Sequence, residues 1–266
     1  MKRNKAPLIA LLVILVLAAG VGTGYFVWYW TGGSVALPTQ RIEPAATTTA
    51  PNTAPTAPSG DTVVTVAPLP ENPVDFATLQ ATNPDIYAWL YIPETNIDYP
   101  VACSSPDKPD DFYLDHNIYG QYEFAGTIYS EKQNGRTMDS RNTVMYGHNM
   151  LNGTMFRTLH YFEDPDFFEE TPEIFVYTPG HILTYTVFAA YEYDNRHILN
   201  SFDFDNDHVW ADYLAYATDP VSMNVLTRDV EVTTDDRILT LSTCVGTNHN
   251  ARYLVQGVLT NDQPTA

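Results

Sequence analysis

The chain has 266 residues, of which 44% are hydrophobic and 13% aromatic, so it is long enough for one globular domain with a sizeable core and an additional segment. Its 13 basic residues against 32 acidic ones give a formal net charge of −19, which argues against a nucleic acid as partner. A dispersed acidic surface keeps a protein soluble and also attracts amine-bearing or cationic partners.

Cysteine and histidine are too sparse and scattered to indicate a metal centre. The two cysteines, Cys103 and Cys244, form no CxxC pair, and the seven histidines are spread along the chain. We therefore predict no metal and no cofactor. One disulfide between the two thiols is left open as an alternative for an oxidising exterior.

The first 30 residues, 1–30, predict a short cytoplasmic stub and a transmembrane signal anchor. Three basic residues lie among the first five, and the apolar stretch 7–30 has no charged side chain, which is enough to cross a bilayer as one helix. Positive charge stays in the cytoplasm, so we expect a single-pass protein of the cell membrane with its folded part outside the cell. A cleaved signal peptide is the alternative, since residues 17–19 resemble a cleavage site, but the stretch continues to an aromatic belt at Trp30.

Residues 31–70 are rich in Thr, Ala and Pro and contain few large apolar side chains. This composition cannot bury enough surface to fold, so we predict a disordered spacer that holds the domain away from the membrane. The folded domain is expected over 71–262, followed by a short tail at 263–266.

Two short helices are expected at the start of the folded domain. Asp75 is a candidate N-cap for a helix that carries Phe76 and Leu79, and a second helical turn is expected to end at Trp89. The sequence then changes to short β-rich runs separated by Asp, Asn, Pro and Gly clusters, which is typical of an all-β domain. These runs cover residues 91–93, 97–101, 126–129 and 143–146.

Two longer helices are expected further along the chain. The first starts at Asn152 and is stopped by Asp164-Pro165, and the second covers 207–218, where an apolar stripe includes Trp210. Four more strands are expected at 174–177, 181–193, 237–243 and 253–259. This succession favours a small β-barrel decorated by a few helices.

Cys244 follows the last residue of the run 237–243, so its thiol is expected at the mouth of a strand, where a substrate can approach. A lone cysteine in this setting is a candidate nucleophile, and a buried structural cysteine is the alternative. Such a thiol needs a histidine nearby. His148 is the preferred candidate because it comes directly after the strand-like TVMYG, and His249, five residues after Cys244, is the alternative. The other five histidines, His160 among them, are interpreted as surface or structural residues.

Arg252 begins the strand that follows the cysteine loop. An antiparallel neighbour would bring its guanidinium beside the thiol, where a permanent positive charge stabilises an oxyanion or a carbonyl. An ordinary ion pair with one of the many acidic residues is the alternative.

Three segments in chain order, YGHNM, TLSTC and NARYLV, carry His148, Cys244 and Arg252 and resemble the sortases. The resemblance spans roughly 75–259, and NPDIYAWLYIPETNIDYPV followed by DFYLDHN is similar specifically to class B. It implies a mainly β fold: a closed eight-stranded barrel with N-terminal helices and an extra helix between late strands, preceded by a transmembrane helix.

The resemblance also implies a membrane-anchored cysteine transpeptidase of Gram-positive surfaces. Cys244 would attack the threonine carbonyl of a C-terminal sorting pentapeptide and carry a thioacyl intermediate, with His148 as general acid and base. Arg252 would stabilise the oxyanion or the substrate, and Ser242 and Thr243 would line the peptide groove. The implied partners are sorting-signal proteins and the amine of a lipid II-type cell-wall precursor.

Alternatives to cell-wall anchoring are a sortase that polymerises pilin through a pilin lysine, a papain-like wall peptidase and a non-enzymatic β-barrel adhesin. A papain-like enzyme usually has its cysteine before its histidine, which is the reverse of the order here. Val245 is one departure from the family pattern, because many class B members have an acidic residue directly after the cysteine.

Overall fold

The structure is a computed structural model that describes residues 69–246 and 248–266. The predicted anchor at 1–30, and the predicted spacer at 31–70 except for its last two residues, lie outside this range. No helix in the described residues is long and apolar enough to cross a membrane.

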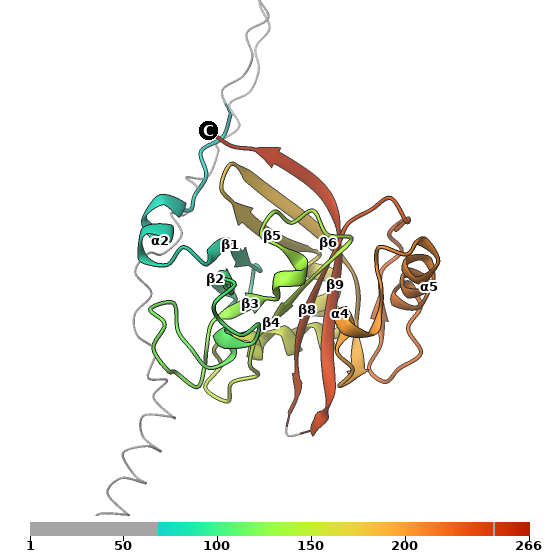
Figure 1. Ribbon diagram of the computed structural model, residues 1–266. Coiled ribbons are helices and arrows are strands. Elements are labelled where there is room, and N and C mark those ends of the chain that lie inside the picture. Colours follow the sequence, from blue (N-terminus) through green and yellow to red (C-terminus); the bar gives the residue numbers. More distant parts are fainter. Residues whose placement is uncertain (1–68, 247) are drawn as a thin grey trace, which may run out of the picture.

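The domain is a closed β-barrel (Figure 1). Its strands are β1 (Ile86–Tyr91), β2 (Asp98–Cys103), β3 (Ile128–Ser130), β4 (Asn142–Tyr146), β5 (Glu173–Thr178), β6 (His181–Asp194), β7 (Leu226–Thr227), β8 (Ile238–Val245) and β9 (Asn248–Pro264). The sheet order is β5-β1-β2-β3-β4-β8-β9-β6-β7, and a further pairing of β5 with β6 closes the ring. The two-residue β7 lies outside the ring and pairs only with β6, so the barrel has the expected eight strands. β9 also takes in the first two residues of the predicted tail.

Helices decorate the barrel on two sides. They are α2 (Phe76–Thr82), α3 (Pro165–Glu170), α4 (Ile198–Ser201) and α5 (Asp207–Thr218), with 3-10 turns η1 (Phe112–Leu114), η2 (Lys132–Asn134) and η3 (Phe156–Glu163). The N-cap prediction is confirmed, because the Asp75 side chain accepts a hydrogen bond from the Thr78 backbone N–H. The helix predicted over 207–218 is confirmed as α5. It follows β6 and precedes β7 in the chain, and it lies outside the barrel on the side opposite α2 (Figure 1).

The predicted second helical turn before Trp89 is wrong, because this segment is β1. Five of its six residues are buried, since β1 pairs with β2 on one side and with β5 on the other. The Trp89 indole donates a hydrogen bond of 2.5 Å to the Asp98 side chain on β2. Long-range pairing therefore overrides the local helical signal.

The helix predicted from Asn152 to Asp164-Pro165 is wrong in type and in its start, whereas its predicted end is confirmed. The segment is a 3-10 helix, η3, which begins at Phe156 and ends at Glu163, and Pro165 then starts a further helix, α3, that was not predicted. The Asp164 side chain accepts hydrogen bonds from two backbone N–H groups of α3, and Pro165 occupies its first turn. An Asp-Pro pair can thus open a helix, because proline has no N–H to leave unsatisfied and its φ already suits the first turn.

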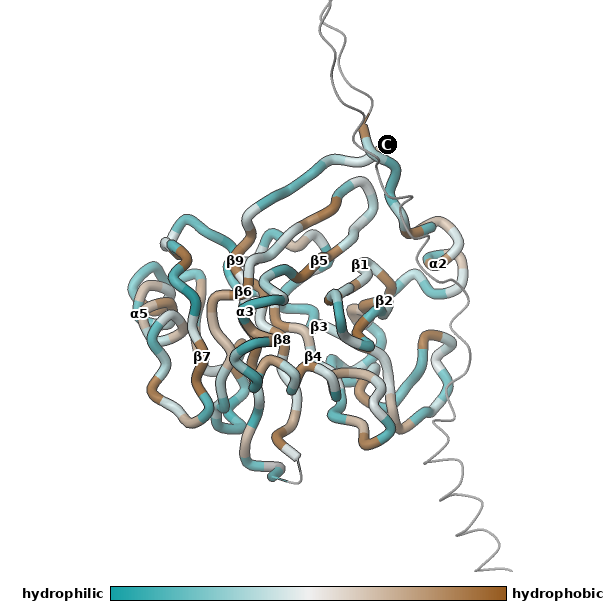
Figure 2. The backbone as a smooth tube through the Cα atoms, turned by 180° about the vertical axis from the view of Figure 1, so that it is seen from behind, coloured by the Kyte–Doolittle hydropathy of each residue, from teal (hydrophilic) through white to brown (hydrophobic). Residues whose placement is uncertain are grey.

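Apolar residues concentrate in the central strands, whereas many connecting loops are hydrophilic (Figure 2). One buried cluster fills the barrel, and a second lies between the outer face of the sheet and the helices α4 and α5. The second cluster includes Val144 of β4, Leu254 of β9 and Trp210 of α5. Gln256 of β9 links the helix to the sheet by two hydrogen bonds. Its side-chain amide donates to the Tyr213 hydroxyl of α5 at 3.0 Å and to the Thr240 hydroxyl of β8 at 2.9 Å. These contacts hold α5 over the strands that carry the predicted site.

The two cysteines do not form a disulfide. Cys103 is the last residue of β2 and only 2% exposed. Burial raises the pKa of its thiol. Cys103 is therefore a packing residue of the barrel.

Candidate active site

Cys244 is half-buried near the end of β8, between β4 and β9. Its direct partner on β9 is Arg252, and Arg252 is in turn paired with Tyr193 on β6. Paired residues of antiparallel strands project from the same face of the sheet, so the side chains of Cys244 and Arg252 are neighbours. The Arg252 guanidinium also donates a hydrogen bond of 3.0 Å to the Ala251 carbonyl.

His148 reaches the same strand end from β4. β4 is parallel to β8 and pairs Tyr146 with Ser242, so His148 and Cys244 each lie two residues beyond that pair in the same direction. Two hydrogen bonds continue the contact past the strand: the Gly147 N–H donates to the Ser242 carbonyl at 3.3 Å, and the Thr243 hydroxyl donates to the Gly147 carbonyl at 2.8 Å. The fold therefore brings the three residues predicted from the sequence, His148, Cys244 and Arg252, to the same end of the sheet.

Position 147 has no room for a side chain, so a glycine is required there. A Cβ atom at this position would lie 2.5 Å from Cδ1 of Ile128 and 2.8 Å from the ring of Phe156. The backbone before His148 therefore passes too close to the barrel core for any side chain, and this close approach holds the imidazole at the strand end.

The surroundings of His148 define its charge and its tautomer. Its Nε2 lies 2.9 Å from the Leu114 carbonyl, and its ring stacks on Phe124 with centroids 5.2 Å apart. A carbonyl only accepts hydrogen bonds, so Nε2 carries the hydrogen and Nδ1 is the basic atom of the neutral ring. Burial lowers the pKa of His148, and the bond to the Leu114 carbonyl opposes this shift only in part. The neutral imidazole is therefore favoured relative to an exposed histidine.

Two residues that sequence analysis missed hold the backbone of Cys244. The Asn149 side-chain amide donates to the Cys244 carbonyl at 2.8 Å, and Nε2 of His160 lies 3.0 Å from the same oxygen and 2.9 Å from the Asn149 amide nitrogen. Arg157 donates to the Asn149 side-chain oxygen at 3.1 Å, and Glu163 pairs with Nδ1 of His160 at 2.6 Å. The position of Asn149 directly after His148 was a usable signal for its role. His160 gave none, because η3 brings it to the site only in three dimensions.

Ser242 and Thr243 occupy different faces of β8. Ser242 lies two residues before Cys244 and therefore shares its face, whereas the Thr243 side chain points the other way and is bonded to Gly147. Val245 is half-buried and packs against the barrel core. The side chain of His249, the alternative histidine, lies outside the described part of the chain.

Within the described residues, no group of three or more His, Cys, Asp or Glu side chains could hold a metal ion. The site is built from a thiol, an imidazole, a guanidinium and backbone groups, which together suit acyl transfer to and from sulfur.

A sortase-domain family model matches residues 90–260. The chain belongs to the sortase family, class B. It is 36% identical over 185 residues to sortase B of Listeria monocytogenes, covering 68% of this chain and 72% of the relative. It is 30% identical over 169 residues to sortase B of Staphylococcus aureus, covering 64% of this chain and 67% of the relative.

Solved sortase structures share the fold. The Clostridium perfringens sortase B structure superposes with a TM-score of 0.63 at 32% identity, covering 70% of this chain and 100% of that one. A Staphylococcus aureus sortase B–substrate complex gives a TM-score of 0.62 at 27% identity, covering 70% and 84% of the two chains. This sortase is therefore a cysteine transpeptidase, and the predictions of a papain-like peptidase and of a non-enzymatic adhesin are set aside.

Proposed function

We propose that this sortase cleaves the C-terminal sorting pentapeptide of secreted proteins after its threonine and transfers them to an amine of a lipid II-type cell-wall precursor. The observation that carries the proposal is the pairing of Cys244 with Arg252, next to the end of β4 that leads to His148. Thioacyl transfer needs a nucleophilic sulfur, a proton carrier and a charge that stabilises the oxyanion, and these are the groups at this strand end.

Cys244 is the nucleophile in this proposal. The chain has two cysteines, and Cys103 is 2% exposed with a thiol pKa raised by burial, so it is neither ionised nor reachable. Cys244 is half-buried at a strand end, where a peptide carbonyl can approach its sulfur.

His148 carries the proton between the two half-reactions. The Cys244 thiolate attacks the threonine carbonyl carbon, the scissile C–N bond breaks, and the leaving amine takes a proton from the imidazolium. An acceptor amine then attacks the thioester carbon, passes a proton to His148 and releases the sulfur as thiolate. Because Nε2 is bonded to the Leu114 carbonyl, Nδ1 accepts and returns the proton. One amide is exchanged for another, and no water is consumed.

Arg252 stabilises the negative charge that develops on the carbonyl oxygen in each tetrahedral intermediate. Its guanidinium remains charged at every relevant pH, so its contribution does not depend on the charge state of His148. Ser242, on the same face as the thiol, would line the proposed groove for the sorting peptide. Thr243, which was predicted to line it as well, faces the other way and supports the strand end through its bond to the Gly147 carbonyl.

The proposed location follows from the sequence at 1–30. Its apolar stretch would hold the enzyme in the cell membrane as a single-pass protein, with the N-terminus in the cytoplasm and the catalytic domain outside. Cell-wall precursor amines are available on that side. Polymerisation of pilin subunits uses the same chemistry with a lysine as acceptor, so the acceptor that reacts distinguishes the two functions.

The test uses the full chain in mild detergent with quenched fluorescent peptides that carry sorting pentapeptides, with and without an amine acceptor. We expect cleavage, a thioacyl adduct on Cys244 detected by mass spectrometry, and loss of both in Cys244→Ala but not in Cys103→Ala. Cleavage that survives Cys244→Ala contradicts the thioacyl mechanism. Loss of turnover in His249→Ala but not in His148→Ala contradicts the assignment of the base.

A further inference from the structure

The segment 195–201 follows β6, contains α4 and crosses the sheet, and we call it the crossing segment. It starts where β6 ends, and its His197 bonds to Glu131, the residue directly after β3, with Nε2 and Oε1 2.7 Å apart. Three strands lie between β6 and β3 in the sheet, namely β9, β8 and β4. The crossing segment therefore spans the strands that carry Arg252 and Cys244.

The crossing segment lies on the same face of the sheet as the thiol. Its Ile198 and Leu199 belong to the second buried cluster, which packs on the outer face together with Leu254 of β9. Leu254 is paired with Ser242, two residues before Cys244, so both of these β8 side chains share the outer face. A peptide that reaches the sulfur therefore lies beside the crossing segment.

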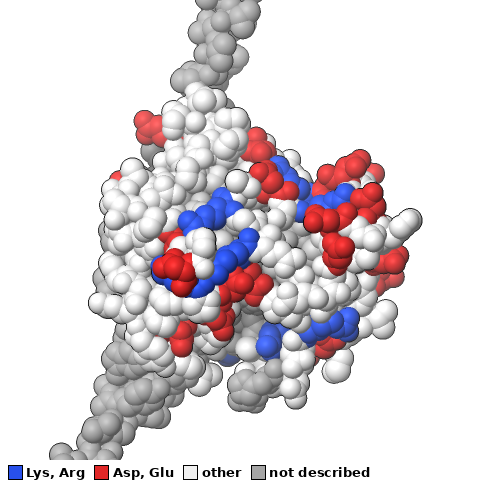
Figure 3. Space-filling model, in the orientation of Figure 1, with Lys and Arg blue, Asp and Glu red and all other residues white. Residues whose placement is uncertain are grey.

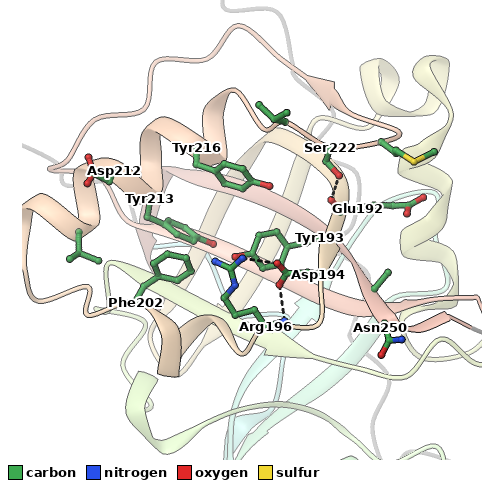
Figure 4. Close-up of a pocket in the computed structure, with 14 residues that line it drawn as sticks. Glu192, Tyr193, Asp194, Arg196, Phe202, Asp212, Tyr213, Tyr216, Ser222 and Asn250 are labelled. Atoms are coloured by element: carbon green, nitrogen blue, oxygen red, sulfur yellow. Dashed lines mark hydrogen bonds and ion pairs between the residues drawn. The ribbon is translucent and has the colours of Figure 1, made fainter.

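The β6 end of the crossing segment is held by Arg196. This residue pairs with Asp194 at 2.7 Å, and its guanidinium lies 5.7 Å from the centre of the Tyr193 ring and 6.0 Å from that of Phe202 (Figure 4). A pocket of about 790 Å³ adjoins these residues and is also lined by α5 and by the start of β9. Because open space lies beside this part of the segment, its course over β8 depends on the contacts at its other end.

His197 joins the crossing segment both to α4 and to Glu131. Its Nδ1 accepts a hydrogen bond from the Asn200 N–H at 3.2 Å and thereby caps α4. In the neutral ring Nε2 then carries the hydrogen and donates it to the Glu131 carboxylate. The ring also lies 6.2 Å from that of Tyr146 on β4, whose strand partner is Ser242. The imidazole is thus fixed beside the sheet surface that leads to the thiol.

The residues after β3 hold the other side of this contact. The Gln133 side-chain amide donates to the Leu199 carbonyl at 3.2 Å, and the Glu131 side chain is only 14% exposed. Burial raises the pKa of the Glu131 carboxyl, and the bond from His197 opposes this shift. A largely buried carboxylate has lost most of its hydration and depends on such a bond, so Glu131 and His197 fix each other's position.

We infer that Glu131 and His197 are positioning residues for the sorting peptide, because their bond holds the crossing segment over β8 as a preformed wall of the groove that leads to Cys244. This inference rests on the proposed function. When the bond is lost, the crossing segment has to be ordered as the peptide binds, which weakens binding and leaves the chemistry at the sulfur unchanged. Side chains of both charges are mixed on this face (Figure 3), so the effect of one carboxylate is local.

The test measures cleavage of a quenched sorting peptide by the full chain in mild detergent. Glu131→Ala and His197→Asn should each raise the KM of the peptide about fivefold to tenfold and leave kcat within about twofold. Asparagine is a good N-cap, so His197→Asn keeps the cap of α4 and removes only the nitrogen that contacts Glu131. Glu131→Gln keeps an oxygen that accepts from Nε2 and should restore the KM to within about twofold of the unmodified chain.

A double variant and a matched control separate this role from a general loss of stability. Glu131→Ala combined with His197→Asn should raise the KM no more than either change alone, because both remove the same bond. His181 pairs with Asp262 at the same distance of 2.7 Å, but at the first residue of β6, whereas the crossing segment follows the last. His181→Asn should therefore leave the KM unchanged.

An unchanged KM in Glu131→Ala, or a loss confined to kcat, would overturn the inference. Hydrogen exchange tests the same bond without turnover, at the backbone N–H groups of Ser201 and Phe202, which donate to the carbonyls of His197 and Ile198. Faster exchange there in Glu131→Ala, with unchanged exchange in β6, supports the positioning role even if no sorting peptide reacts. Unchanged exchange contradicts it even if thioacyl transfer is confirmed.

Discussion

The side-chain amide of Asn149 donates a hydrogen bond of 2.8 Å to the backbone carbonyl of Cys244. Asn149 follows His148 directly, so a single bond ties the segment that carries the imidazole to the residue that carries the thiol. The Arg157 guanidinium donates a hydrogen bond to the side-chain oxygen of Asn149 and thereby fixes the orientation of the amide. The relative position of imidazole and sulfur thus depends on a residue that needs no contact with the substrate.

Asn149→Ala should lower kcat about fivefold to tenfold with little change in the KM of the sorting peptide, because a bond to a backbone carbonyl contributes about 1 kcal/mol. The pH dependence of Cys244 alkylation should shift as well, since the thiol and imidazole separate. Asn200→Ala, an exposed position on α4, is the matched control. An unchanged alkylation profile together with an unchanged kcat contradicts this positioning role.

His160→Phe should reduce kcat severalfold while retaining the stacking on Tyr253, whose ring centre lies 5.0 Å from that of His160. The replacement removes the nitrogen that contacts the Cys244 carbonyl and the partner of Glu163. Thermal unfolding measured in parallel separates a local effect from a loss of stability. A kcat equal to that of the unmodified chain at equal stability shows that Asn149 alone holds the carbonyl.

Phe124→Ala should raise the pKa of His148 towards its ordinary value, because the stacked ring contributes to the burial that lowers it. The imidazolium would then persist to higher pH. NMR titration of the His148 ring protons measures the shift, and Tyr122→Ala, a 70% exposed aromatic on the same loop, is the control. A downward shift in Phe124→Ala would show that the lowered pKa has another cause.

Gly147→Ala should reduce turnover at least tenfold, since the new methyl group overlaps Ile128 and Phe156 and must displace His148. Adding Ile128→Ala removes the side-chain atom closest to the new methyl group, at 2.5 Å, and should restore part of the activity. Peptide cleavage by the single and double variants measures this coupling. Full activity of Gly147→Ala alone contradicts the spatial requirement.

Asp85→Asn should lower the free energy of unfolding by about 2 kcal/mol at pH 7. Burial alone would raise the pKa of Asp85, but bonds from Lys108, Tyr113 and Arg136 outweigh it and lower the pKa from 3.8 to about 2. Since the folded pKa is below the ordinary one, the stabilisation is present above about pH 4 and disappears as the pH falls through about 2.

Urea unfolding of the Asp85→Asn variant and the unmodified chain at pH 7, 4 and 2 measures this dependence. The difference between them should decrease with pH. A difference that stays constant over this range would mean that Asp85 acts through its shape and hydrogen bonds, and not through its charge.

The sequence by itself determined the strand that leads to Cys244, the strand-like run before His148, the helix at 207–218 and the three side chains expected to act together. Periodicity, turn residues and caps are local, so they can be read along the chain. The motifs YGHNM, TLSTC and NARYLV added the order along the chain, His148, Cys244 and then Arg252, in which the catalytic residues occur. Local signals misled at two places. The segment that ends near Trp89 was predicted as a helical turn but pairs as β1, and at Pro165 a new helix begins, with Asp164 as its N-cap.

Only the tertiary structure decided what surrounds these groups. The parallel pairing of β4 with β8 brings His148 to Cys244 across about a hundred residues, and η3 delivers His160 to the Cys244 carbonyl. The pocket lined by Tyr193, Tyr213 and Tyr216 likewise exists only because β6, α5 and β9 meet. Such contacts depend on barrel closure and register, which are cooperative properties of the whole chain and leave no local pattern to read.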